Sequence, residues 1–158
     1  MNEQEFIRRA GAVRSRLYRT AYLYLGGEHA ALDAVDEAVY RAFSGYRKLR
    51  REDFFETWLT RILINVCKDE LRRQSREVVT DSLPESSQQQ LDALPLKQAV
   101  AALPEELRSV IILRYFAGCT LEETAAALDI PRGTVSTRQK RALELLRLEL
   151  TDGKEAAP

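Results

Sequence analysis

Apolar residues recur every three or four positions along most of this 158-residue chain, which is the spacing of an amphipathic helix. No stretch alternates apolar and polar residues as a half-buried strand would. The first periodic segment begins after Asn2, a good helix N-cap, and stops at the glycine pair 26–27. Its apolar positions are Phe6, Ala10, Val13, Leu17, Ala21 and Tyr24.

Two more helices are predicted in the N-terminal half. The second extends to Gly45, with an apolar face made of Leu32, Val35, Val39 and Phe43. The third begins near Asp53, a plausible N-cap, and continues to about Arg73. Its apolar positions are Phe55, Trp58, Leu59, Ile62, Leu63 and Val66.

The periodicity disappears between residues 77 and 94. This segment contains Pro84, serines, a glutamine triplet and four acidic residues, without any Lys or Arg. Such a composition is typical of a flexible linker, and the length is unusual for a loop inside one compact domain. We therefore predict an all-α protein with two small helical domains, 1–76 and 95–150, an acidic flexible linker at 77–94 and a disordered tail at 151–158.

The C-terminal half is also helical by pattern. A short helix is predicted from Leu96, Ala99, Val100 and Leu103. Pro104 suits the first position of the next helix, which Gly118 would end, with Val110, Ile111, Leu113 and Tyr115 as its apolar body.

The segment TLEETAAALDIPRGTVSTRQKRALELL, residues 120–146, predicts two short helices separated by a tight turn. Thr120 and Glu123 have the spacing of a capping box, and Pro131 interrupts the first helix. The apolar positions of the two helices are Leu121, Ala125 and Leu128, then Val135, Ala142, Leu145 and Leu146. This is the sequence form of a helix-turn-helix, whose second helix enters a DNA major groove.

Charge distinguishes a DNA-reading helix pair from an ordinary helical hairpin. Residues 132–147 carry five basic residues and one acid, Glu144, and hydroxyl residues lie near the start of the second helix. Groove reading needs such a surface. A solvated helix face is the alternative interpretation.

The whole chain is electrically neutral, with 24 basic and 24 acidic residues, so its net charge gives no indication of nucleic-acid binding. The charges are nevertheless segregated. Residues 47–76 hold nine basic and five acidic residues, whereas 28–39 and 77–94 each hold four acids and no Lys or Arg. Such separate basic and acidic surfaces indicate several different partners.

The sequence gives little support for an enzymatic activity or a metal site. Cys67 and Cys119 are far apart, and His29 is the only histidine, so the expected state is two free buried thiols in a reducing compartment. No nucleotide-binding fingerprint, nucleophile elbow or zinc pattern occurs. We expect no catalytic residue, metal, cofactor or small-molecule substrate. No membrane-length apolar run or signal peptide is found, which favours the cytoplasm.

The third helix is a second candidate for nucleic-acid binding. Aromatic residues lie among its cations, an arrangement in which rings stack on unpaired bases while the cations follow phosphates. Trp58 and Phe55 also have the spacing of ordinary core residues. The acids Asp33, Asp36 and Glu37 could form a carboxylate pair for catalysis or metal binding, but an acidic face without basic partners, open to another protein, is the favoured interpretation.

Three segments together resemble a known family. They are AALDAVDEAVYRAF, FFETWLTRILINVCKDELRRQSR and ALPEELRSVIILRYFAGCTLEETAAALDIPRGTVSTRQKRALELL. With them the chain resembles an extracytoplasmic-function sigma factor, a two-domain minimal member of the main bacterial sigma family. The resemblance implies a promoter-specificity subunit of RNA polymerase that does no chemistry itself.

The resemblance also implies partners and sites. The first domain would bind the clamp helices of the largest polymerase subunit and the melted minus-ten element, and the second would bind duplex minus-thirty-five DNA and the flap of the second subunit. The linker would thread toward the RNA exit path, and an anti-sigma factor, often membrane-anchored, would hold the protein inactive. Core-polymerase residues would be Asp33, Asp36, Glu37 and Tyr40. Minus-ten residues would be Arg50, Arg51, Phe54, Trp58, Arg61, Asn65, Lys68, Arg72 and Arg73. Minus-thirty-five residues would be Arg132, Thr134, Ser136, Thr137, Arg138, Lys140 and Arg141.

Three positions depart from the family pattern. Asp36 stands where glutamine is usual, Ser136 replaces a common lysine, and Gln139 occupies an inward position that is usually apolar. Two rival functions remain at this point. A stand-alone helix-turn-helix repressor or activator needs no single-strand surface, and a helical protein adaptor needs no basic face.

Overall fold

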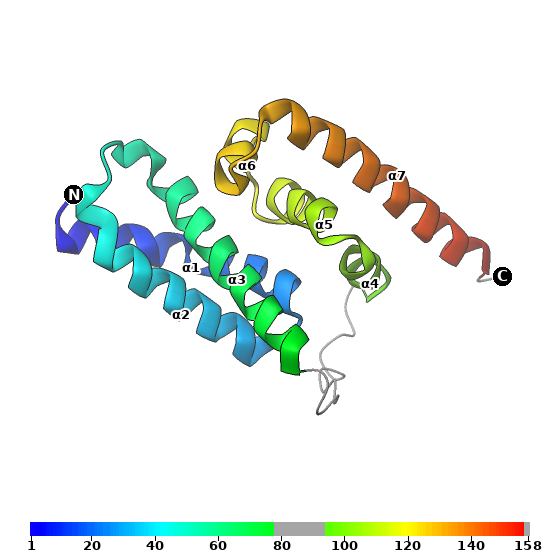
Figure 1. The fold of residues 1–158 in the computed structure, drawn as a ribbon, viewed down its shortest axis with the longest axis horizontal. Helices are drawn as coiled ribbons and strands as arrows, with labels where there is room; N and C mark the ends of the chain where they lie inside the picture. The colour runs from blue at the N-terminus through cyan, green and yellow to red at the C-terminus, as the bar shows by residue number, and fades with distance from the viewer. Residues whose placement is uncertain (78–93, 157–158) are drawn as a thin grey trace.

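The computed structural model describes residues 1–77 and 94–156, and within these ranges every regular element is helical. The N-terminal half contains α1 (Glu3–Leu25), α2 (Glu28–Gly45), the short turns η1 (Tyr46–Lys48) and η2 (Glu52–Phe54), and α3 (Phe55–Glu77). The C-terminal half contains α4 (Leu94–Ala102), α5 (Glu105–Ile111), the π-helical turn η4 (Ile112–Phe116), α6 (Leu121–Leu128) and α7 (Arg132–Ala156). The all-α prediction is confirmed (Figure 1).

The N-terminal half is a bundle of α1, α2 and α3 built on the predicted stripe of α1. All six predicted apolar residues of that helix are buried. The Asn2 side chain accepts a hydrogen bond from the Glu5 backbone N–H, and Gly26 ends the helix in the left-handed conformation with φ 77°. Both predicted ends of α1 are therefore confirmed.

The predicted apolar face of α2 is confirmed for Val35 and Val39 but wrong for Leu32 and Phe43. The buried stripe consists of Ala31, Ala34, Val35, Ala38 and Ala42, whereas Leu32 and Phe43 are 40% and 42% exposed. Alanines allow α1 and α3 to approach this helix closely, so the small residues face inward and the larger ones remain at the rim. A prediction from the apolar and polar pattern alone favours the larger apolar side chains as the buried ones, and in this helix the alanines are buried instead.

The start and end of α3 also differ from the prediction. Asp53 does not begin the helix, because it belongs to the short turn η2, and its carboxylate accepts a hydrogen bond from Arg51 instead. The helix then continues beyond Arg73 to Glu77.

In the C-terminal half, α5 runs directly into the π turn η4. The predicted glycine is confirmed as a stop: Gly118 has φ 75°, which an L side chain rarely adopts. Ile112 and Leu113 are fully buried, but Tyr115, predicted as core, is 51% exposed. The wider π turn changes the helical phase after Ile111, which a 3.6-residue period cannot anticipate.

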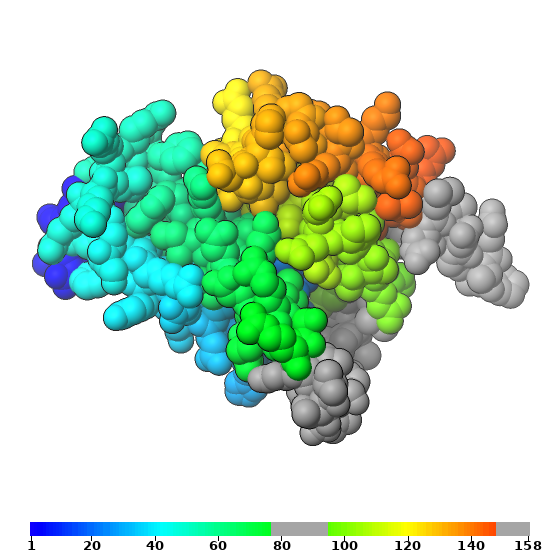
Figure 2. Space-filling view, viewed as in Figure 1, coloured from blue at the N-terminus to red at the C-terminus, as the bar shows by residue number. Residues whose placement is uncertain are grey.

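The two halves pack directly against each other. Helix α3 contacts α6, and α1 contacts both η4 and α4. Accordingly α3 has two buried sides, one with Phe55, Leu59 and Leu63 and another with Thr57, Thr60 and Ile64. Figure 2 shows the α6–α7 region seated against α3 without a gap.

Two predictions concern the ends of these elements. The predicted linker lies, apart from its terminal residues 77 and 94, outside the described residues. In the structure α7 continues to Ala156, through most of the segment predicted as a disordered tail. A single Gly153 costs a helix about 1 kcal/mol relative to alanine and does not end it. Residues 157–158 lie outside the described residues.

Candidate nucleic-acid and polymerase interfaces

The helix-turn-helix begins with the predicted capping box on α6. The Thr120 hydroxyl accepts a hydrogen bond from the Glu123 N–H, and the Glu123 carboxylate accepts one from the Thr120 N–H. The helix ends at Asp129, a non-glycine residue with φ 59°. Aspartate tolerates this left-handed conformation better than most residues, so the sharp turn into α7 needs no glycine.

The buried side of α6 was only partly predicted. Thr124 and Ala127 are fully buried, whereas Leu121, Ala125 and Leu128 are half-buried. Because α6 packs against α3 as well as α7, its buried positions are distributed over two directions rather than one stripe.

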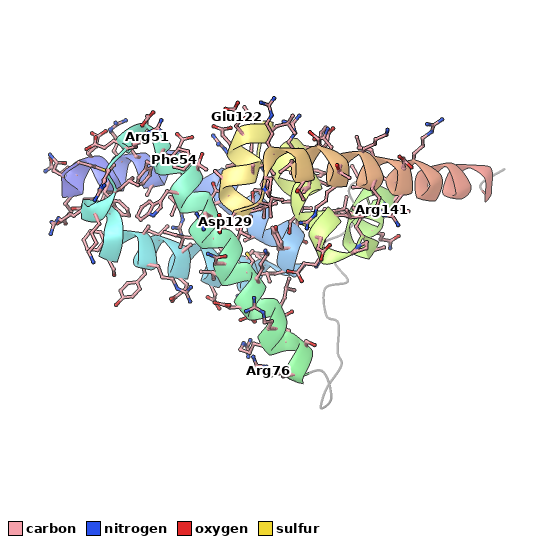
Figure 3. All side chains as sticks on the ribbon, turned by 45° about the horizontal axis from the view of Figure 1, so that its top comes forward. Arg51, Phe54, Arg76, Glu122, Asp129 and Arg141 are labelled. Atoms are coloured by element: carbon pink, nitrogen blue, oxygen red, sulfur yellow. The ribbon has the colours of Figure 1, made fainter. Side chains whose placement is uncertain are left out.

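Helix α7 separates an inward side from an exposed basic side. Val135, Ala142 and Leu146 are buried in its contact with the rest of the half. The predicted DNA residues lie on the other sides: Arg132, Ser136, Thr137, Lys140 and Arg141 are exposed, and Thr134 and Arg138 are half-buried. Figure 3 shows Arg141 along α7, well separated from the labelled residues Arg51 and Phe54 of the other half.

Gln139 has a polar partner where an apolar contact was expected. Its side-chain carbonyl accepts a hydrogen bond of 2.8 Å from Arg114 Nε in η4. The Arg114 Nη1 donates a second bond of 2.7 Å to the Cys119 carbonyl. The unusual glutamine is therefore satisfied by an arginine that the sequence reasoning did not consider.

The predicted minus-ten residues lie along one side of α3 and on the preceding loop. Arg50, Arg51, Phe54, Arg61, Asn65, Arg72 and Arg73 are exposed, and Trp58 and Lys68 are half-buried. Trp58 packs near Phe55, with ring centroids 5.9 Å apart, so it contributes to both the core and the surface. The Arg51 guanidinium lies 5.7 Å from the centroid of the Phe54 ring.

The loop before α3 is attached to α1, which the sequence reasoning missed. Arg9 Nη2 donates a hydrogen bond of 2.7 Å to the Glu52 carbonyl, and the N-terminal ammonium forms a 2.5 Å ion pair with the Glu52 carboxylate. The Arg9 guanidinium also lies 4.8 Å from the Phe55 ring centroid. These contacts order the loop that carries Arg51 and Phe54.

Most cations of the α3 surface are paired with nearby acids. Arg51 pairs with Asp53 at 3.1 Å, Arg72 with Asp69 at 2.9 Å and Arg73 with Glu70 at 2.6 Å. The hydrogen bond from Arg51 lowers the pKa of Asp53, and the bond from Arg73 lowers that of Glu70. Both carboxylates therefore stay charged beside their cations at neutral pH.

Arg61 forms an ion pair that crosses between the halves. Its guanidinium lies 3.2 Å from the Asp129 carboxylate at the end of α6, and both side chains remain partly exposed. Arg61, which was predicted to face DNA, therefore forms an ion pair with the turn of the helix-turn-helix. Figure 3 shows Asp129 over α3.

The acidic residues of α2 occupy a mixed surface rather than a purely acidic one. Asp33 and Glu37 line a groove of about 350 Å³ between α2 and α3, together with Arg41, Asp69 and Arg73. Asp36 pairs with Arg14 of α1 at 2.5 Å and Glu37 with Arg41 at 2.9 Å. The predicted lack of basic partners is wrong, because neighbouring helices and the next helical turn supply them. Tyr40 is 68% exposed.

The thiols show no reactive environment. Cys67 and Cys119 are both free and buried, and burial raises the pKa of Cys67 to about 12 and that of Cys119 to about 11. Within the described ranges no cluster of three or more histidine, cysteine or carboxylate side chains could hold a metal ion. No helix there is long and apolar enough to cross a membrane.

Comparison with known families gives two matches in one chain. The family model for Sigma-70 region 2 matches residues 10–77, and the model for Sigma-70, region 4 matches residues 99–148. The first match contains the α3 surface and the α2 groove, and the second contains the helix-turn-helix.

Similar proteins agree with these matches. The RNA polymerase sigma factor SigV of Bacillus subtilis is 33% identical over 139 residues, covering 85% of this chain and 84% of that protein. The ECF RNA polymerase sigma factor SigW of the same organism is 31% identical, covering 88% and 85%. Among solved structures, the sigma factor RpoE of Bartonella quintana in complex with the anti-sigma factor NepR is 24% identical, covers 94% of this chain and 98% of that one, and has a TM-score of 0.79. CnrH in complex with the cytosolic domain of CnrY is 21% identical, covers 96% and 90%, and has a TM-score of 0.73.

Proposed function

Because the chain belongs to the sigma-70 family and is an extracytoplasmic-function sigma factor, an alternative sigma factor that directs RNA polymerase, we propose how its two halves divide that task. The C-terminal half reads a duplex promoter element, and the N-terminal half binds core polymerase and captures the melted strand. Sigma factors are initiation factors, and the polymerase supplies the chemistry.

Duplex reading by α7 is supported by its exposed cations and hydroxyls. Arg138, Lys140 and Arg141 form no ion pair with any other described residue, so their charge is available to phosphates and base edges. Thr137 donates its hydroxyl hydrogen to the Gly133 carbonyl at 3.0 Å and can still accept a hydrogen bond. This available basic side of a capped helix-turn-helix is the observation that carries the proposal.

Strand capture by α3 is supported by aromatic and polar groups that share one surface. Asn65 offers an exposed amide, Phe54 an exposed ring, and Arg50 an exposed cation. Stacking on a base and hydrogen bonds to its Watson–Crick edge become possible only after it leaves the duplex. The surface is therefore suited to an unpaired strand in the minus-ten element.

Core-polymerase binding is assigned to the side of α2 that carries Asp33, Asp36, Glu37 and Tyr40. The groove with both signs of charge and the exposed Tyr40 ring fit a polar helical partner such as the clamp helices. We further assign contact with the flap of the second subunit to the C-terminal half.

The present arrangement of the halves competes with binding to promoter DNA. The Asp129 carboxylate competes with phosphate for the Arg61 guanidinium, and α6 covers one side of α3. We propose that α6 leaves α3 when both promoter elements are bound.

We propose an anti-sigma partner because the similar sigma factor RpoE was determined in complex with the anti-sigma factor NepR. The partner would hold this chain inactive in the cytoplasm and could be membrane-anchored.

The test is transcription by holoenzyme assembled from the full chain and bacterial core polymerase. We expect co-purification with core and transcripts from a fork-junction template that carries a duplex upstream element. A chain that binds duplex DNA without core and never supports transcription would instead be a stand-alone regulator.

A further inference from the structure

Arg114 is a half-buried link between the two helices of the helix-turn-helix. It lies in the π turn η4, between the fully buried Leu113 and the exposed Tyr115, and is itself half-buried. One guanidinium reaches α7 through Gln139 and reaches the Cys119 carbonyl, immediately before the α6 N-cap Thr120. The same side chain therefore fixes the start of α6 and the middle of the DNA-facing part of α7.

The geometry of the guanidinium makes this link directional. Nε and Nη1 point in fixed directions within one plane, so bonds of 2.8 Å and 2.7 Å constrain both acceptors at once. An apolar residue at 139 would keep α7 packed but would add no directional bond to define its rotation about its own axis. Val135, Ala142 and Leu146 provide that packing without directional bonds.

Gln139 lies between two candidate DNA contacts. Arg138 and Lys140 are its direct neighbours, and Arg141 follows one position later. A small rotation of α7 moves each of these side chains relative to the base edges, where hydrogen bonds depend on both distance and angle.

We propose that Arg114 is a positioning residue for promoter recognition, acting through Gln139 and the Cys119 carbonyl to set the orientation of α7 on duplex DNA. The inference rests on the proposed duplex-reading function. Arg114 contributes to base preference without contacting DNA itself.

Three variants of the full chain test it. R114K keeps the positive charge but loses the planar fork, and Q139L removes the acceptor while preserving bulk. Q139E replaces the amide oxygen with a carboxylate oxygen that can still accept from Arg114, and it serves as the conservative variant. R108K is the matched control, because Arg108 is also half-buried and bonds the Ala101 carbonyl at 3.3 Å, a contact within the same half that includes no residue of α7.

The measurement is base preference of holoenzyme on a duplex library randomised over the upstream element. Wild type, Q139E and R108K should enrich the same sequences. In R114K and Q139L the ratio of binding to preferred sites over binding to single-base-substituted sites should fall about tenfold. This is a typical effect of one misplaced base contact. The dependence of their binding on salt should match that of wild type, since Arg114 neutralises no phosphate.

Three results would overturn the proposal. An unchanged preference in R114K and Q139L, with only a lower melting temperature, would make the link purely structural. A flatter salt dependence in R114K would make Arg114 a phosphate contact. If wild-type holoenzyme enriched no upstream sequence, the duplex-reading function would fail and this inference with it.

Discussion

The cationic surfaces of α3 and α7 look alike in sequence but differ in how their charges are engaged. On α3 the arginines Arg61, Arg72 and Arg73 pair with carboxylates, and Lys68 forms no ion pair with any described residue. On α7 only Arg132 forms an ion pair among the described residues, with Glu122 at 3.3 Å, while Arg138, Lys140 and Arg141 form none.

This difference fits binding to two forms of DNA, an intact duplex at α7 and a melted strand at α3. A helix that meets intact duplex gains from cations that are already available, because phosphate contact dominates affinity. A surface that meets DNA only after melting has to exchange its internal acid partners for phosphates. Exposed ion pairs are worth about 0.2–1 kcal/mol each, so the exchange is readily reversible.

The largest expected effect tests the α7 side. Arg138→Ala or Arg141→Ala should weaken binding to the duplex upstream element by about 1–3 kcal/mol if the residue reads a base edge. If it contacts only phosphate, the loss should be similar for all sequences and the salt dependence should flatten. Holoenzyme titrations on duplexes at several salt concentrations measure both. Unchanged binding in both variants would remove α7 as the reading helix.

Substitutions on α3 should cause a comparable loss of activity only on templates whose strands must separate. Asn65→Ala, or alanines at Arg50 and Arg51, should hurt transcription from duplex promoters much more than from pre-melted ones, since stacking one base is worth about 1–3 kcal/mol and is gained only after unpairing. Permanganate reactivity on matched duplex and bubble templates reports open-complex formation. Equal activity of variant and wild type on the duplex would make α3 structural.

A smaller effect should distinguish the polymerase-binding surface of α2 from the two DNA-binding surfaces. Replacing Asp33, Asp36 and Glu37 together with alanine should weaken holoenzyme assembly by about 0.2–1 kcal/mol per charge. Because two of these acids also pair within the chain, a melting curve of the triple variant is the control for fold. Normal assembly in gel filtration would leave the α2 face as solvated surface.

The smallest effect concerns the contact between the halves. Asp129→Asn keeps a residue that tolerates φ 59° and removes the charge opposite Arg61. Loss of one exposed ion pair, worth about 0.2–1 kcal/mol, should shift the chain toward the separated arrangement and raise binding of bubble DNA by up to about fivefold. Glu122→Gln, which removes the partner of Arg132 within the C-terminal half, is the matched control. Higher bubble affinity in the control alone would contradict this role for Asp129.

Local features could be predicted from the sequence wherever the residues that cause them lie within one short segment. The Asn2 cap, the Thr120–Glu123 capping box and the glycine stops at 26 and 118 all depend on residues within one helical turn. The apolar stripe of α1 was also found, because that helix buries its large residues on one side.

Features that depend on neighbouring helices were missed. Alanines of α2 face inward because α1 and α3 lie close, and Leu32 and Phe43 stay at the rim. The partner of Asp36 is 22 residues earlier in the chain, and the partner of Gln139 is 25 residues earlier. Sequence periodicity contains no information about such distances, because side-chain pairs between helices depend on how the helices pack.

The sequence by itself determined that this protein is helical, that its C-terminal half carries a helix-turn-helix with a basic second helix, and which family it resembles. Those properties follow from residue spacing, caps and local charge, which act over one or two turns. Only the tertiary structure decided that Arg61 is held by Asp129 of the other half, and that α6 rests on the side of α3 next to Arg61. The physical reason is that this ion pair depends on a distance of a few ångströms between residues far apart in sequence, which packing alone sets.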